Sequence, residues 1–130
     1  MTAVLSDYHG HTTALVDAEH AAKVFDEQAE AIMPTGTAGQ TIWVGTEEDR
    51  KMLRVDVDID AGRAALRWMS DGTHAVELPV GDPLSVLERI GRGPVTISAE
   101  LARVTPATAR AAVAEFVATG RRPTCVTWVA

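Results

Sequence analysis

The stretch Leu53-Arg54-Val55-Asp56-Val57-Asp58-Ile59-Asp60 alternates strictly between aliphatic and charged residues. An alternation of period two is typical of a strand with one face on a hydrophobic core and the other in water. The aspartates are therefore expected on the solvent face, where carboxylates two residues apart lie about 7 Å from one another. The stretch predicts a half-buried strand.

A second strand follows the Ala61-Gly62 dipeptide, and the two strands are expected to form an antiparallel hairpin. Its apolar residues occupy even rather than odd positions, namely Ala64, Leu66 and Trp68. Because directly paired residues share a face, this switch requires a turn of two or four residues. Arg63 and Arg67 then lie opposite or diagonal to the aspartates, which predicts cross-strand ion pairs.

Two further segments predict helices. Asp17 can cap a helix over residues 18–32, before a loop rich in Gly and Thr at residues 33–39. Thr105 is a second N-cap with Pro106 at the first helical position, and Gly120 ends this helix in a left-handed cap. Strands are expected at residues 41–44, 52–59, 64–69, 73–78 and 124–129. These elements predict an α+β fold, with a mostly antiparallel sheet of about five to six strands and two main helices packed on one face.

The length of 130 residues and the 46% hydrophobic content fit a single domain over residues 1–130. No apolar run reaches the roughly 20 residues of a membrane span, and the first residues lack the pattern of a secretory signal. Cys125 is the only cysteine, which excludes an internal disulfide and a cysteine-based zinc cluster. A cytoplasmic globular protein is expected.

The net charge of −6 is unevenly distributed along the chain. Residues 1–60 hold twelve acidic and four basic residues, a charge of −8, whereas residues 61–130 hold six and eight, a charge of +2. Nucleic-acid binding depends on clustered Lys and Arg, so direct binding of nucleic acid is not expected. An acidic surface favours rapid association with a basic protein partner, although mild acidity also keeps ordinary proteins soluble.

Residues with catalytic or metal-binding chemistry are few. His9 and His11 are close in sequence, but no third or fourth ligand has the spacing that would complete a metal site. Cys125 lies in an apolar strand without a neighbouring histidine, which favours a buried structural thiol over a nucleophile. No glycine-rich phosphate-binding motif occurs. The sequence therefore predicts no catalytic residue, no metal and no cofactor.

The aspartates of the central strand are the first candidate partner contacts, namely Asp56, Asp58 and Asp60. On a solvent face they would present a negative ladder to a cationic partner. The alternative is an exposed face that the neighbouring arginines already neutralise, which is the commoner arrangement. General acid–base catalysis would require burial to raise the pKa of one carboxyl, and the alternation places all of them in water.

The turn before this strand adds three acidic residues, Glu47, Glu48 and Asp49, with fewer basic neighbours. They extend the same ladder. Trp43 lies on the strand expected before the turn. Tryptophans on strands more often belong to a core, but aromatic residues also anchor interfaces. Trp43 therefore joins the six carboxylates as a candidate contact.

Two blocks of the sequence resemble a known protein family. One is the hairpin at residues 53–68 with the Asp71-Gly72 turn after it, and the other is residues 100–128. Both resemble the bacterial immunity proteins of polymorphic toxin systems, in the family numbered first among them. The resemblance is to the group that includes the inhibitor of a double-stranded DNA cytosine deaminase toxin. It covers roughly residues 50–130, while residues 1–49 agree only in general layout.

The resemblance implies a non-enzymatic α+β inhibitor that binds a zinc-dependent nucleic-acid deaminase toxin and blocks its active site. The recognisable blocks are scaffold, so specificity for the toxin is expected in the acidic first half. A nucleic-acid deaminase needs a basic channel for phosphates, which carboxylates can occupy. The toxin's substrate, DNA or RNA, and self-association of the inhibitor stay open. No membrane partner is expected.

Two other functions are compatible with the residues. One is a non-enzymatic binding module or regulator of another basic protein partner. The other is a small hydrolase or transferase using His9, His11 or Cys125, which the spacing of these residues does not favour.

Overall fold

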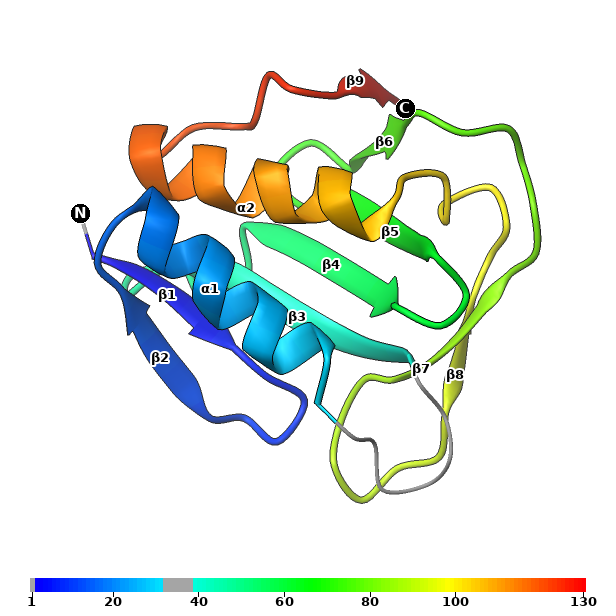
Figure 1. The fold of residues 1–130 in the computed structure, drawn as a ribbon, viewed down its shortest axis with the longest axis horizontal. Coiled ribbons are helices and arrows are strands. Elements are labelled where there is room, and N and C mark those ends of the chain that lie inside the picture. The colour runs from blue at the N-terminus through cyan, green and yellow to red at the C-terminus, as the bar shows by residue number, and fades with distance from the viewer. Residues whose placement is uncertain (1, 32–38) are drawn as a thin grey trace.

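The computed structural model describes residues 2–31 and 39–130. Within these ranges two helices and nine strands follow one another along the chain (Figure 1). The strands are β1 (Ala3–Ser6), β2 (Thr12–Leu15), β3 (Gly39–Thr46), β4 (Leu53–Asp58), β5 (Arg63–Trp68), β6 (Thr73–Val76), β7 (Leu84–Leu87), β8 (Val95–Ile97) and β9 (Thr127–Val129). The helices are α1 (Ala18–Ala29) and α2 (Pro106–Thr119). The predicted α+β class is confirmed, with more strands than expected.

The strands form one sheet, in which the main order is β2-β1-β3-β4-β5-β6-β9 and every pairing along this order is antiparallel. β7 pairs in parallel with the start of β3, with Gly39 opposite Val86, and antiparallel with β8. β1 pairs with the other end of β3, with Ser6 opposite Trp43. Because β4 occupies the second side of β3, β1 and β7 share one edge of this strand. β1, β2 and β7 were not predicted.

The hairpin of β4 and β5 has the predicted register. Asp58 lies opposite Arg63, which leaves a turn of four residues. The aliphatic residues of β4 are buried in the main core together with residues of β5 and of both helices. Arg67 is diagonal to Asp56 and makes the predicted cross-strand ion pair, with 3.0 Å between Nη2 and Oδ2.

The helices lie side by side across one face of the sheet, as predicted (Figure 1). Asp17 caps α1 by accepting a hydrogen bond from the His20 amide. α1 ends at Ala29, earlier than the predicted residue 32, and the loop predicted at residues 33–39 lies outside the described residues except for Gly39. The last buried residue of α1 is also Ala29.

The second helix has both predicted caps. The Thr105 side chain accepts a hydrogen bond from the Thr108 amide, and Gly120 has the left-handed backbone conformation, with φ of 70°. Phe116 is fully buried, and its ring centroid lies 5.9 Å from that of Trp68 on β5. Neither helix has the length and the apolar content to cross a bilayer, so far as the described ranges go.

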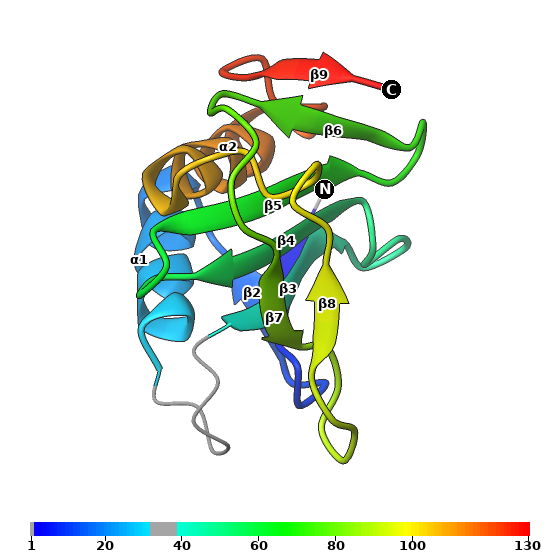
Figure 2. The ribbon, with the colours of Figure 1, turned by 90° about the vertical axis from the view of Figure 1, so that its right-hand side faces the viewer.

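The β7–β8 hairpin covers part of the opposite face of the sheet (Figure 2). A second hydrophobic cluster fills this layer, and its buried members are Ala65, Leu84, Val86, Ile97 and Ala102. Gly39 lets β7 approach β3, since a Cβ at this position would clash with the Ser85 carbonyl oxygen. The expectation that this whole face lies in water is therefore wrong at the centre of the sheet.

Candidate functional site

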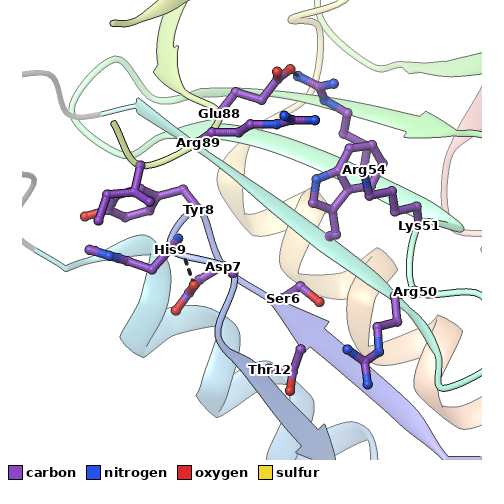
Figure 3. Close-up of a pocket in the computed structure, with 13 residues that line it drawn as sticks. Ser6, Asp7, Tyr8, His9, Thr12, Arg50, Lys51, Arg54, Glu88 and Arg89 are labelled. Carbon is purple, nitrogen blue, oxygen red and sulfur yellow. Dashed lines mark hydrogen bonds and ion pairs between the residues drawn. The ribbon is translucent and has the colours of Figure 1, made fainter. Parts of the chain in front are cut away.

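A cleft of about 540 Å³ opens on the face of the sheet away from the helices (Figure 3). Three segments line it together with Trp43: residues 6–10 and 12 of the β1–β2 hairpin, residues 50, 51 and 54 around the start of β4, and residues 88–90 after β7. The Ile90 amide donates a 2.9 Å hydrogen bond to the Tyr8 carbonyl oxygen. This bond joins two of the three walls through the main chain.

The cleft is basic, although the protein is acidic. Its lining contains four cationic side chains, those of Arg50, Lys51, Arg54 and Arg89, and two carboxylates, those of Asp7 and Glu88. With neutral histidine the formal charge of the lining is +2, against −6 for the chain. Of the seven candidate contacts predicted from the sequence, only Trp43 lines this cleft.

Trp43 is half-buried and forms part of the cleft wall. Lys51 Nζ and Arg54 Cζ each lie 5.2 Å from the centroid of its ring. Cations at this distance from an indole are attracted by the negative face of its π-system. The structure therefore places this candidate contact in an accessible position, with two cations beside it.

Asp56 is fully buried, so its predicted place on the solvent face is wrong. It belongs to a buried charge cluster, which we define as Arg54, Asp56, Arg67 and Glu88. Asp56 accepts hydrogen bonds from Thr41 Oγ1 at 2.7 Å, Arg54 Nε at 3.1 Å and Arg67 Nη2 at 3.0 Å. β7 and the segment after it cover this part of β4, which is why a carboxylate in an alternating strand has no water beside it.

Arg54 links the buried charge cluster to the cleft. Its Nη2 lies 2.7 Å from Glu88 Oε2, while its Nε bonds both oxygens of Asp56. Burial alone lowers the pKa of Arg54, but the hydrogen bonds and charges of Asp56 and Glu88 outweigh it and leave the pKa raised. The guanidinium is therefore a permanent, fixed cation beside Trp43.

Glu47, Glu48 and Asp49 occupy the turn between β3 and β4 and are exposed. The turn is closed by main-chain and side-chain bonds, since the Thr46 amide donates to the Asp49 carbonyl at 2.8 Å and the Asp49 amide donates to Thr46 Oγ1 at 3.2 Å. Arg50 and Lys51, which line the cleft, follow directly. The acidic turn and Trp43 therefore belong to one region of the surface.

Asp58 and Asp60 lie at the other end of β4, about 17 Å along the strand from Leu53. Asp58 is half-buried and accepts a hydrogen bond from the Ala61 amide, and Asp60 is exposed. With Asp56 buried, the three aspartates do not form a continuous ladder. The structure separates these two from the acidic turn.

The residues considered for catalysis lie far apart in the sheet. His9 and His11 follow β1, next to the β2 edge, and their rings stack with centroids 5.5 Å apart. Cys125 precedes β9, which is the opposite edge. It is exposed, so the prediction of a buried thiol is wrong. Partial burial and the nearby Glu115 carboxylate raise the pKa of the Cys125 thiol, which keeps it protonated and weakly nucleophilic.

Glu115 of α2 fastens the segment before β9. It accepts hydrogen bonds from the Thr124 amide at 2.6 Å, from Thr124 Oγ1 at 2.9 Å and from the Cys125 amide at 3.0 Å. Burial raises the pKa of the Glu115 carboxyl, but these bonds outweigh burial and leave the pKa below its ordinary value. Glu115 is therefore a charged tether for the last strand.

We expect Glu115→Gln to lower the free energy of unfolding by about 1 kcal/mol at neutral pH. A carboxyl whose pKa is lowered by folding stabilises the protein above its unfolded pKa and loses this contribution as the pH falls through its folded pKa. The difference between wild type and variant should therefore shrink from about pH 7 to about pH 3 in urea unfolding. Glu100→Gln, at an exposed position, is the control, and its difference in unfolding free energy from wild type should not vary over this pH range. A difference that grows toward low pH would contradict this assignment.

A family model of the immunity protein Imm1 matches residues 9–130. The chain belongs to the Imm1 family of immunity proteins. A search of curated proteins found no match. The Imm1 match begins well before residue 50, so it includes α1, β3, the acidic turn and most of the cleft. Membership of the Imm1 family implies toxin neutralisation by binding a cognate toxin protein, and it favours an inhibitor over an enzyme.

The basic side of the cleft was not predicted from the sequence. Arg50 and Lys51 stand directly after three acidic residues, so their charges cancel in any local average. Arg89 and the exposed Ile90 come from a segment after β7, a strand that was itself missed. Only the pairing of Trp43 with Arg54 across the β3–β4 hairpin depends on residues close enough in the sequence to be predicted from it.

Proposed function

We propose that this Imm1 family member binds and neutralises a cognate nucleic-acid deaminase toxin whose substrate is cytosine in DNA. The inhibitor occludes the basic cleft of the toxin that holds this substrate. Enzymes that act on nucleic acids neutralise phosphates with Lys and Arg, and deaminases hold the extruded base in a pocket beside such a channel. A protein with exposed carboxylates can compete for this channel. The resemblance of residues 53–68 and 100–128 to inhibitors of such toxins supports this choice of partner.

The observation that carries the proposal is the acidic turn. Glu47 and Glu48 are exposed at the tip of the β3–β4 hairpin and make no ion pair with any residue that the structure describes. Their charges are thus free to meet a basic partner. Trp43 on the same hairpin supplies an aromatic surface of the kind that dominates interface energetics.

The other candidate contacts have different roles in the proposal. Asp58 and Asp60, at the far end of β4, form a second and smaller acidic site at the margin of the interface. Asp56 is inaccessible and acts as a positioning residue for Arg54. The contacts are therefore expected to centre on the acidic turn.

We expect the double variant Glu47→Lys/Glu48→Lys to weaken binding of the toxin domain about 100-fold, mostly through a slower association rate. Isothermal titration calorimetry and stopped-flow kinetics at two salt concentrations would measure it, with the toxin encoded by the neighbouring gene. Glu19→Lys/Glu27→Lys is the matched control, because it makes the same charge change on exposed positions of α1, on the opposite face. Asp58→Lys/Asp60→Lys should have an intermediate effect.

Equal affinities of the Glu47→Lys/Glu48→Lys variant and the wild type would remove the acidic turn from the interface. Failure of the wild type to bind or protect against any deaminase toxin would reject this partner. Binding to a different basic protein would then favour a regulator of that protein. Turnover of a substrate by the purified chain would reject an inhibitory role.

A further inference from the structure

Three of the cationic side chains that line the cleft have no acidic partner among the described residues. Arg50, Lys51 and Arg89 are exposed, and their side chains form no ion pair with the residues that the structure describes. Figure 3 shows Arg50 on the side of the β3–β4 turn and Arg89 on the side of the segment after β7. Three cations therefore surround the opening without a partner inside the described chain.

The wall between these cations is fixed in position. Arg54 has only 11% of its side chain exposed and is bound by both Asp56 and Glu88, so its orientation is set by the buried charge cluster. Arg54 and Lys51 both lie beside the ring of Trp43. Ile90, with 59% of its surface exposed, adds an apolar edge to the same opening. An occupant meets a preorganised surface of cations and apolar groups, which reduces the entropy cost of binding.

We propose that this cleft receives a carboxylate-bearing segment of the toxin, whose Asp or Glu side chains pair with Lys51 and Arg89 while an adjacent apolar side chain packs on Trp43 and Ile90. The inference rests on the proposed function in taking the toxin as partner. It adds that the toxin presents negative charge beside its basic cleft. Arg and carboxylate groups match in geometry, which makes such a contact specific.

Charge complementarity favours an acidic protein segment over nucleic acid. Asp7 and Glu88 also line the cleft, and Glu47, Glu48 and Asp49 directly precede Arg50. These carboxylates line or adjoin the cleft and disfavour a phosphate backbone, because salt at physiological ionic strength screens charges mainly beyond about 8 Å. A protein segment can place single charges between neutral residues, so its carboxylates can contact the cations of the cleft without lying beside these acidic residues.

The two charged parts of this surface then have opposite preferences. The acidic turn meets basic residues of the toxin, and the adjacent cleft meets acidic ones. Alternating signs at neighbouring positions fix the orientation of a complex and disfavour partners with a different pattern. This arrangement predicts discrimination between cognate and non-cognate toxins by the cleft.

The first test is Lys51→Glu/Arg89→Glu, which leaves the buried charge cluster intact. We expect affinity for an inactivated toxin domain to fall about 100-fold with an unchanged unfolding midpoint. Lys23→Glu/Arg121→Glu is the matched control at exposed cations outside the cleft, and it should bind like wild type. Among toxin variants with single Asp→Lys or Glu→Lys changes, at least one should restore binding to Lys51→Glu/Arg89→Glu by about 10-fold or more. If wild type binds and Lys51→Glu/Arg89→Glu binds equally well, the cleft assignment is overturned while the proposed function stands.

A second test does not depend on the toxin. In NMR titrations of the wild type, a peptide whose Glu residues are separated by neutral and apolar residues should shift the Trp43 indole signal and the amides of residues 51 and 89, and Lys51→Glu/Arg89→Glu should abolish these shifts. A single-stranded oligonucleotide of similar charge should leave the same NMR signals unshifted. Larger shifts with the oligonucleotide, or none with the peptide, would overturn the assignment to an acidic protein segment. If the wild type binds no toxin, this titration still decides the chemistry of the cleft.

Discussion

Asp56→Ala is expected to lower the free energy of unfolding by about 3–5 kcal/mol. The substitution removes the only carboxylate that Arg67 pairs with among the described residues and one of the two that hold Arg54. Two guanidinium groups would then lie in a largely dehydrated layer with too few acceptors, and a buried charge without a partner is far more costly than an absent pair. The Thr41 hydroxyl would lose its acceptor as well.

Chemical denaturation of matched variants would measure this effect. Asp56→Asn preserves the volume of the side chain, so a loss close to that of Asp56→Ala would assign the effect to charge rather than to a cavity. Asp60→Ala, at an exposed position of the β4–β5 turn, should change stability by less than about 0.5 kcal/mol. A cost for Asp56→Ala as small as that of Asp60→Ala would show that Asp56 is solvated in the folded protein.

Gly39→Ala is expected to cost about 3 kcal/mol, the upper end of the range for overpacked positions. The new Cβ would meet the Ser85 carbonyl oxygen and lie 2.9 Å from Val86 Cγ1, and a main-chain atom cannot move aside alone. β7 would have to withdraw from β3. This withdrawal would uncover the buried charge cluster, so hydrogen exchange should increase along both β7 and β4.

Gly93→Ala provides the control, since a Cβ at that position meets no atom within 4 Å and the residue has no positive φ. It should leave stability and exchange close to wild type. Equal exchange rates in Gly39→Ala and wild type would mean that the parallel pairing of β7 with β3 does not close this side of the sheet.

The elements predicted correctly from the sequence are those that local signals specify. The period-two pattern of β4, the parity switch into β5, the Thr105-Pro106 start and the Gly120 end of α2 all depend on residues within a few positions of one another. Such signals do not depend on segments that are distant in the chain. The resemblance to a family of immunity proteins, which rested on these same segments, is confirmed at the level of the family.

The burial of Asp56 could not be read from β4 because the cause lies about thirty residues further along the chain. β7 has only four residues, follows Pro83 and carries no long alternation, so its pairing with β3 has no local signature. The same absence concealed the basic cleft, whose wall includes the segment after β7. Cys125 was misplaced for a related reason, since β9 is an edge strand and begins only at Thr127.

The shared edge of β3 has a consequence for how such an inhibitor can change its partner. Two walls of the cleft are attached to the same strand by main-chain pairing, and the bond from the Ile90 amide to the Tyr8 carbonyl oxygen ties them to each other. None of these attachments uses a side chain. Exposed lining residues outside the buried charge cluster, such as Lys51 and Arg89, can therefore be exchanged while the opening keeps its width. Under the proposed function, one backbone could then serve different toxins.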